Sequence, residues 1–356
     1  MEYEYKDLQI LNQYKKSNLV RIIFIVSIIM LIFLFSLFVI TIGPLEISVF
    51  DTYKVIFNKL LPNWVDSPGE SIVSVIWLVR VPRVLTAIIV GFSLAVAGAV
   101  IQPVLRNSMA SPFTLGLSSG AGFGAALAII LGKSIGFGMY YIIANAFFFS
   151  LITSAIILII SRLKEITPEM MILIGIAISH LFSAGITMLQ YFADSLLVSE
   201  VLFWMVGSLS KGTWETLKIM FPIVFIGVIL LIIKSKDLNY ISVGEDEAKS
   251  LGVDVEKTRI ILLTISSLVI STTICFTGSI GFVGLISPHI TRLIMGNDNN
   301  FVVPVSGLIG ALLLLLSDFI AMNLITPIVI PIGVMTSFLG VPMFIYLIIR
   351  RKRGSF

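Results

Sequence analysis

The stretch KSKDLNYISVGEDEAKSLGVDVEKTR, residues 234–259, is the most highly charged segment between two long apolar runs of this chain. It holds five Lys or Arg and six Asp or Glu, although only 12% of the whole chain is charged. Ser242 stands three residues before Glu245, a spacing typical of a capping box at a helix N-terminus. Gly252 suits the left-handed residue that ends a helix, and Asp254 suits the cap of the next one. The stretch predicts a short helix, a glycine turn and a second helix at a membrane surface.

Two interpretations of this stretch remain open on local grounds. One is a solvated loop with local capping. The other is a lever that a partner outside the membrane pushes.

Composition decides the class of protein. The chain has 356 residues, of which 57% are hydrophobic, against about 45–50% in a typical soluble domain. Apolar runs of about 20 residues recur, which is the length that crosses a bilayer. The single cysteine, Cys275, excludes an intramolecular disulfide. The net charge is +4, but the basic residues lie at the boundaries of the apolar runs. The charge therefore does not indicate nucleic acid as a partner.

The apolar runs predict an all-α integral membrane protein with about ten transmembrane helices in one domain, residues 1–356. The first run is too long for a signal-peptide core, so we expect it to be retained. The run at 279–295 is the least secure, because it is short and interrupted by glycine and proline. The expected spans are 22–40, 72–104, 113–131, 137–161, 169–192, 216–233, 258–277, 279–295, 302–326 and 332–349.

Lys and Arg predict the orientation in the membrane. With the N-terminus inside, seventeen of the 24 fall in inner segments and seven in outer ones. We therefore expect both termini in the cytoplasm, with a polar tail at 1–20 and a basic tail at 350–356. The stretch 234–259 then lies in the cytoplasm between the sixth and seventh spans.

Small residues mark helix faces that can approach closely in a membrane. Ordinary helix packing and a path or moving interface are both compatible with such faces. The two stripes are Gly91, Ala95 and Gly98 in the second span, and Gly116, Gly120 and Gly124 in the third.

Signs of enzyme chemistry are weak. The glycines of 120–124 imitate a dinucleotide loop, but no strand precedes them. Gly132-Lys133-Ser134 imitates the end of a phosphate-binding loop, but position 127 is Leu127, where that motif requires glycine. No His, Cys and carboxylate cluster has metal-ligand spacing. We therefore expect no catalytic residue, no metal site and no cofactor bound by this chain.

Two polar residues stand out inside the spans. Asp318 lies in the ninth span, where a charge costs about 2.5–3.5 kcal/mol on insertion scales, so it should face protein or water. Structural pairing and a role in a transport path both fit Asp318. His180, in the fifth span, fits a satisfied interior histidine or a residue that lines a path.

A series of motifs follows the same order along this chain as in one known family. In them the chain resembles the permease subunits of the ABC importers for iron–siderophores and cobalamin, the FecCD-type permeases of type II importers. The resemblance covers about residues 72–350. The motifs are Arg80-Val-Pro82-Arg83, GFSLAVAGAVIQPVLRNSMASPFTLGLSSGAGFGA at 91–125, WMVGSLS at 204–210, GEDEAKSLGV at 244–253, GSIGFVGLISPHITRLIMG at 278–296 and PIGVMTSFLGVPMFIYLI at 331–348.

The resemblance implies a ten-span permease in the cell membrane that works by alternating access. Its partners would be a second permease copy, as a homodimer or close heterodimer, and two ATP-binding cassette subunits that hold ATP and Mg and hydrolyse the nucleotide. A substrate-binding protein outside the membrane would deliver the cargo. The implied cargo is an iron chelate such as an iron–siderophore, with cobalamin, haem or an oxyanion as alternatives. A secondary transporter coupled to an ion is a further alternative, for which Asp318 is the one candidate acid.

The resemblance also implies roles for residues. The segment 244–253 matches the coupling helices that seat in the ATPase, which gives Gly244, Glu245, Glu247, Ala248, Leu251 and Gly252. Thr167, Pro168 and Glu169 match the inner gate, and we add His180, Gly120 and Asp318 as candidates for the path. His180 stands where the family has a small residue.

Arg80 and Arg83 lie near the outer end of the second span and fall on one helix face. Two exposed guanidinium groups can bind carboxylates bidentately. We therefore expect these arginines to dock the binding protein, or alternatively to reach lipid phosphates.

Overall fold

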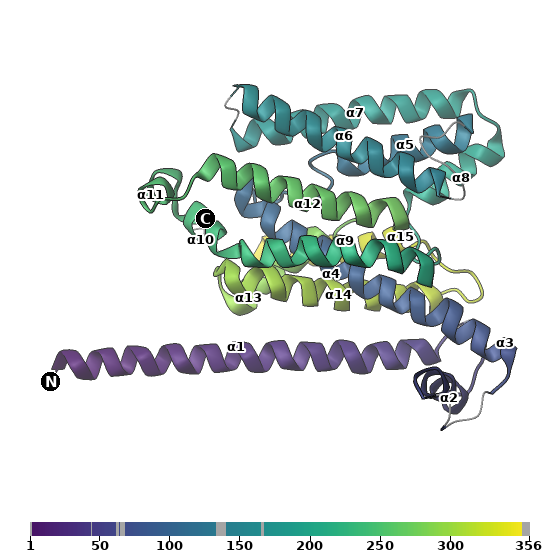
Figure 1. Cartoon of the computed structure of the whole chain (residues 1–356), viewed down its shortest axis with the longest axis horizontal. Coiled ribbons are helices and arrows are strands. Elements are labelled where there is room, and N and C mark those ends of the chain that lie inside the picture. Colours follow the sequence, from purple (N-terminus) through teal and green to yellow (C-terminus); the bar gives the residue numbers. More distant parts are fainter. Residues whose placement is uncertain are drawn as a thin grey trace.

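The computed structural model describes residues 2–43, 45–61, 64, 68–132, 140–164 and 167–350. Among these residues there is no strand beyond one isolated bridge between Ile325 and Ile328. The all-α fold expected from the sequence is confirmed (Figure 1). Residues 133–139, which hold Lys133 and Ser134, and 351–356, which make up most of the basic tail, lie outside the described residues.

Each expected span coincides with a helix. In the described residues, seven helices are long and apolar enough to cross a membrane, while α5, α8, α13 and the apolar part of α15 are shorter. The count of ten spans stays a prediction. The helices are α1 (Glu2–Thr41), α2 (Val49–Leu60), α3 (Glu70–Val73), the π-helix η1 (Ser74–Arg80), α4 (Val81–Val104), α5 (Leu117–Leu131), α6 (Tyr141–Lys164), α7 (Pro168–Tyr191), α8 (Ser195–Met205), α9 (Trp214–Ile233), α10 (Ser235–Val243), α11 (Glu245–Ser250), α12 (Val255–Thr277), α13 (Val283–Met295), α14 (Asn299–Asn323) and α15 (Ile332–Arg350).

Helix α4 lies at the centre of the bundle and packs against α14, α13, α12 and α9. Small residues allow this packing, as the stripe in the second span predicts. A Cβ atom at Gly91 would overlap the backbone of Gly310, and one at Gly98 would overlap the carbonyl oxygen of Gly284. The stripe of Gly91, Ala95 and Gly98 is therefore a close helix contact, in which dispersion replaces the hydrophobic drive that lipid cannot supply.

The helices α5 and α6 form a second close pair. A Cβ atom at Gly120 would overlap Thr153, and one at Gly124 would overlap the carbonyl oxygen of Asn145. The predicted contact face is confirmed for these two glycines. Gly116 instead precedes α5 in the left-handed conformation, with φ of 70°.

Apart from α10 and α11 in the stretch 234–259, two helices lie outside the expected spans. Helix α2 lies in the polar gap 43–70, and α8 lies in the segment between the fifth and sixth spans. Both are too short to give a span signal. The second span also differs in detail: η1 widens it just before Pro82, which has no N–H to continue the α-helical ladder.

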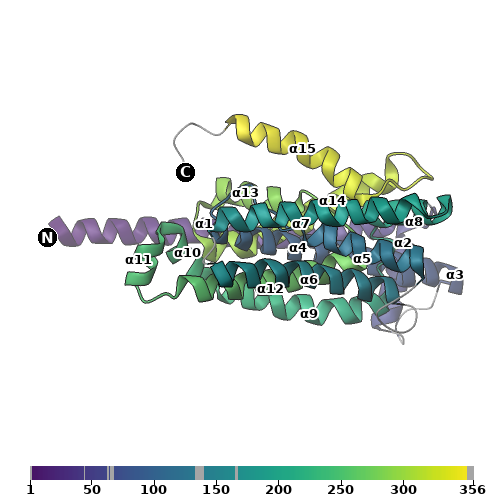
Figure 2. The ribbon, with the colours of Figure 1, turned by 90° about the horizontal axis from the view of Figure 1, so that it is seen from above.

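The short helices and the chain ends gather at the two opposite ends of the bundle. The start of α1, the pair α10–α11 and the end of α15 lie at one end, and α2, α3 and α8 lie at the other (Figures 1 and 2). Figure 2 shows α15 diverging from the bundle toward its C-terminal half. Its residues Ile345 and Tyr346 are accordingly exposed.

Candidate functional site

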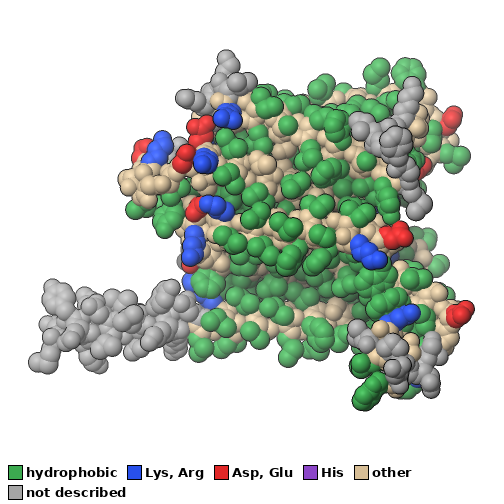
Figure 3. Space-filling view, viewed as in Figure 1, with side chains coloured by type: hydrophobic (Ala, Val, Ile, Leu, Met, Phe, Trp, Pro, Cys, Tyr) green, Lys and Arg blue, Asp and Glu red, His purple; other side chains and the backbone are tan. Residues whose placement is uncertain are grey.

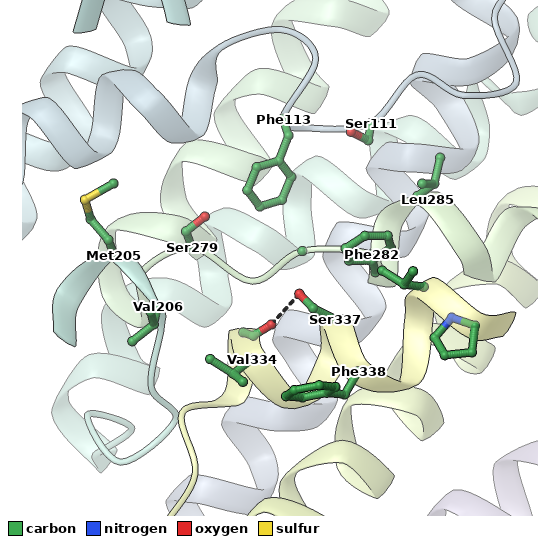
Figure 4. Close-up of a pocket in the computed structure, with 14 residues that line it drawn as sticks. Ser111, Phe113, Met205, Val206, Ser279, Phe282, Leu285, Val334, Ser337 and Phe338 are labelled. Carbon is green, nitrogen blue, oxygen red and sulfur yellow. Dashed lines mark hydrogen bonds between the residues drawn. The ribbon is translucent and has the colours of Figure 1, made fainter. Parts of the chain in front are cut away.

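A largely apolar cavity of about 790 Å³ lies between α15, α13, the end of α8 and the loop before α5 (Figure 4). None of its lining residues is charged. Phe113, Phe282 and Phe338 supply aromatic surface, and three serines supply hydroxyl groups. The lining residues are Ser111, Phe113, Met205, Val206, Ser279, Gly281, Phe282, Leu285, Gly333, Val334, Ser337, Phe338, Val341 and Pro342.

The cavity forms where helices are interrupted. Helices α5 and α13 have 15 and 13 residues, which span about 20 Å, less than the roughly 30 Å of a hydrocarbon core. The irregular segments that precede them, 105–116 and 278–282, supply the remaining chain. Gly116 lies against Gly175, well inside α7, so this irregular backbone is at membrane depth. Irregular backbone is tolerated there only when it is buried in protein or lines a hydrated cavity.

Hydrogen bonds hold the interrupted segments together. The Ser118 and Ser279 hydroxyl oxygens are 2.6 Å apart, and the N–H of Ser208 donates to the carbonyl of Thr277 at 2.7 Å. The N–H of Gly333, at the start of α15, donates to the carbonyl of Val206 at 3.0 Å. Some of the backbone groups at these interruptions are thus paired across elements.

Phe282 is the N-cap residue just before α13, and it has a φ of 64°. A bulky side chain with positive φ is strained, and such strain collects at functional positions. Its Cβ atom lies against Gly340 of α15, which leaves no room for a side chain at that position. A Cβ atom at the neighbouring Gly281 would meet only the ring of Phe113, at 3.6 Å, so Gly281 faces the open cavity.

The predicted coupling segment forms a projecting tip at one end of the bundle (Figure 1). Helix α11 ends in a Schellman motif. The N–H of Gly252 donates to the carbonyl of Lys249 at 2.9 Å, and the N–H of Val253 donates to the carbonyl of Ala248 at 3.0 Å. Gly252 has a φ of 84°, so the predicted glycine stop is confirmed. Ala248 is buried beneath the tip, whereas Leu251 is 65% exposed.

The predicted capping box is wrong, while the predicted cap at Asp254 is confirmed. Ser242 lies inside α10, and its hydroxyl donates to the Leu238 carbonyl at 2.7 Å. Gly244 is the cap residue of α11 and makes no side-chain cap. An additional helix, α10, thus precedes the one that the sequence predicted. Asp254 accepts the N–H of Lys257 at 3.0 Å at the start of α12. The side chain of Glu245 lies outside the described residues.

A polar cluster joins α10 to the start of α14. Asp298 caps α14 and accepts the Asn239 side-chain amide at 2.8 Å, while Asn239 accepts the N–H of Asn299 at 2.8 Å. Burial opposes the charged form of Asp298, but hydrogen bonds from Asn239 and Asn300 and the charge of Arg21 hold its pKa below the ordinary value. We call Asn239, Asp298, Asn299 and Asn300 the α10–α14 clamp.

Arg80 is not an exposed docking residue. Its side chain is 5% exposed, and its guanidinium donates to the carbonyls of Ile40 and Thr41 at 3.0 and 2.9 Å and to that of Leu45. It therefore satisfies the carbonyls that the end of α1 leaves unpaired. Gly43 leaves space for the guanidinium, which a Cβ atom there would approach at 3.1 Å.

Arg83 is also engaged within the chain. Its guanidinium binds Asp318 of α14 at 2.8 Å and donates to the Ser210 hydroxyl at 3.0 Å. The Asp318 side chain is 0% exposed and that of Arg83 is 11% exposed. The expectation of two exposed guanidinium groups is therefore wrong, and of the two roles considered for Asp318 the structure shows structural pairing.

The other candidates for the path lie apart from the cavity. Gly120 is inside the α5–α6 contact, so it does not line an open path. His180 is exposed on α7, so it is not an interior residue of this chain, and its role in a path stays a prediction. Thr167 is the cap residue of α7, Pro168 is buried in its first turn, and Glu169 is exposed beside it. The roles of these three residues as a gate stay a prediction.

Sequence reasoning selected none of the cavity residues. The signal was present in two of the motifs, 278–296 and 331–348, in which glycine and proline interrupt apolar runs. Such interruptions in corresponding spans are the usual sequence sign of a site between broken helices.

Comparison with known proteins gives one consistent result. The model of the FecCD transport family matches residues 28–350. A hemin transport system permease of Yersinia pestis is 37% identical over 78% of this chain and 84% of its own length. A molybdate import system permease of Haemophilus influenzae is 35% identical over 88% of this chain and 91% of its own. A solved metal-chelate type ABC transporter in an inward-facing conformation aligns with a TM-score of 0.80 and 32% identity, over 91% of this chain and 98% of that one.

Proposed function

Since this chain belongs to the FecCD transport family, we propose that it is the permease of an ATP-driven importer that carries iron chelates such as iron–siderophores. Family membership makes the chain an ABC importer permease and a multi-pass protein of the cell membrane.

The lining of the cavity supports a bulky chelate as cargo. An oxyanion that leaves water needs charged or N–H donors, and none of the side chains around the cavity is Lys, Arg or His. Aromatic and aliphatic surface with a few hydroxyl groups suits a large ligand whose own donor atoms are already engaged by a metal. The volume of about 790 Å³ falls in the range of small-molecule sites, roughly 300–1,000 Å³.

A secondary transporter coupled to an ion is excluded by the family assignment. Asp318, its one candidate acid, is bound bidentately by Arg83 and fully buried. Its carboxylate is thus engaged in an ion pair that joins α14 to α4.

The inferred conformation opens toward the end of the bundle that carries α10 and α11. The C-terminal half of α15 diverges from the bundle at that end (Figure 2), as expected for a permease that faces inward. The exposed tip around Leu251 and Val243 then offers apolar contact to an ATP-binding subunit below the membrane. Two such subunits, a second copy of this chain and an external binding protein complete the proposed importer.

Uptake into proteoliposomes tests the cargo. We expect the reconstituted importer with its binding protein to accumulate a ferric siderophore only when ATP is inside and the ATPase subunit is active. Haem, cobalamin and molybdate are offered in parallel. Preferential uptake of any of these would overturn the proposed cargo and leave the importer class intact.

A substitution at Gly281 tests the path. Gly281→Leu adds a side chain to the cavity without meeting backbone, so it should reduce uptake severalfold while the protein inserts and assembles normally. Gly281→Ala is the matched control and should transport at a near wild-type rate. Undiminished uptake by Gly281→Leu would mean that cargo does not pass through this cavity.

A further inference from the structure

Helix α2 presents an unpartnered apolar face at the end of the bundle opposite α10 and α11. Phe50, Phe57 and Leu61 are 73%, 52% and 49% exposed. Phe50 and Phe57 are seven residues apart, so they lie on one face of the helix, and Leu61 follows directly after its last residue. Trp64, just beyond it, is 84% exposed. The opposite face is anchored, because Thr52 and Val55 are fully buried.

The orientation of α2 is fixed by contacts with neighbouring elements. The Tyr53 hydroxyl donates to the Leu37 carbonyl of α1 at 3.4 Å. The guanidinium of Arg80 binds the carbonyl of Leu45 in the segment that leads into α2. Figure 1 looks along α2 while α1 runs lengthwise across the view, so α2 runs crosswise to α1. A helix that runs crosswise to a membrane span lies along the membrane plane.

The surface beside α2 is already one that meets lipid. Along α1, the side chains of Phe33, Leu34 and Phe38 are about half exposed in a helix that crosses the membrane. In Figure 3 the hydrophobic side chains of this side of the molecule continue to the end at which α2 lies. The apolar face of α2 thus extends the lipid-facing surface of α1 around the edge of the bundle.

The charges of α2 fit the headgroup region. Lys54 lies beside the apolar face, with its ammonium group 5.6 Å from the centre of the Phe50 ring, and Lys59 is exposed in the last turn. Lysine stems can cover apolar surface while the ammonium groups reach phosphate. Tryptophan and other aromatic residues favour the same layer.

We propose that α2 is an interfacial helix that lies in the headgroup layer of the outer leaflet, with Phe50, Phe57 and Leu61 buried in lipid. Amphipathic helices of this kind sink about 5–10 Å into the boundary between headgroups and acyl chains. Through Arg80 and Tyr53, the contact fixes the outer ends of α1 and of the span Glu70–Val104 at one membrane depth. The proposal rests on membrane insertion, not on the cargo or on ATP.

Spin labels on α2 test this arrangement in lipid nanodiscs that contain phosphatidylglycerol. Phe50→Cys and Phe57→Cys place nitroxides on the apolar face, and Lys59→Cys places one on the other side. Cys275 is buried and should not react. Because the replaced phenylalanines are exposed, folding should not depend on them. We expect the ratio of collisions with oxygen to collisions with an aqueous nickel chelate to be severalfold higher at positions 50 and 57 than at 59.

Two results would overturn the proposal. Ratios at positions 50 and 57 as low as those of a water-exposed site would place the face in water. Protection of positions 50 and 57 that develops only when the external binding protein is added would make α2 a protein docking surface. Fluorescence of Trp64 gives a second, label-free measurement. The emission of Trp64 alone is that of the wild type minus that of Trp64→Phe, and brominated lipids should quench it.

Discussion

Asp318 and Arg83 form a buried ion pair whose two members come from α14 and α4. Removing one partner of such a pair leaves an uncompensated charge, which costs about 3–5 kcal/mol. We therefore expect Arg83→Met to lower the free energy of unfolding by that amount in detergent micelles. Arg83→Met combined with Asp318→Leu should recover most of the loss, because an apolar pair can replace a buried ion pair. Additive losses in the double variant would show that the two side chains act independently.

This pair marks a limit of sequence reasoning. The cost of a buried carboxylate predicts that Asp318 needs a partner, but its partner is 235 residues away. The spacing of Arg80 and Arg83 predicts that both side chains lie on one face of a helix. It does not predict which residues that face contacts. Their positive charge suggested an external partner, whereas the guanidinium groups bind an internal carboxylate and the carbonyls at the end of α1. Pairings across a fold follow from packing, which local pattern does not contain.

Helix α5 allows a matched comparison of two glycines. A Cβ atom at Gly120 would overlap the Thr153 hydroxyl, whereas one at Gly122 would meet only side-chain ends at 3.5 Å and beyond. Gly120→Ala should therefore destabilise the protein by about 1–3 kcal/mol through overpacking. Gly122→Ala should be neutral or slightly stabilising, because alanine favours the helix. Thermal unfolding of both variants measures the difference, and equal effects would contradict the α5–α6 contact.

The glycine that ends α11 gives a test of the coupling tip. Gly252 has positive φ but open space around its Cβ position, so only backbone strain opposes substitution. Gly252→Val should cost roughly 1–2 kcal/mol locally and distort the Schellman turn. Gly252→Asn tolerates the left-handed conformation and serves as the control. We expect the valine variant to insert normally and to bind the ATPase subunit severalfold more weakly in pull-down titrations, with the asparagine variant close to wild type. Equal binding would place the ATPase contact elsewhere.

The α10–α14 clamp predicts a pH dependence. The pKa of Asp298 is lower in the folded protein than its ordinary value of 3.8. Its contribution to stability is therefore complete above that value and is lost as pH falls through the folded pKa. Asp298→Ala removes a helix cap and should cost about 0.5–2 kcal/mol at pH 7. The difference in melting temperature between the wild type and this variant should stay constant down to about pH 5 and shrink below pH 4. A difference that does not shrink at all as the pH falls below 4 would assign it to packing.

At the scale of the whole molecule, hydropathy was sufficient to predict an integral membrane protein and the positions of its spanning helices along the chain. Every expected span contains a helix, because twenty apolar residues have few alternatives in a bilayer. The cavity was not predictable in the same way. It depends on where α5 and α13 begin within the membrane, and on the strained Phe282 just before α13, which lies inside the single expected span 279–295.

The exposed face of α7 and α8 provides the last prediction. Leu181, Tyr191 and Leu196 are 70%, 82% and 83% exposed, and α15 diverges from the same side of the bundle (Figure 2). If a second copy of this chain covers this face, Tyr191→Cys and Leu196→Cys should each cross-link two copies in membranes under mild oxidation. Leu34→Cys, on the lipid-facing side of α1, is also exposed, at 56%, and should remain a monomer on the gel. Cross-linking at Leu34→Cys with none at Tyr191→Cys would move the interface to α1 and leave α7 to lipid.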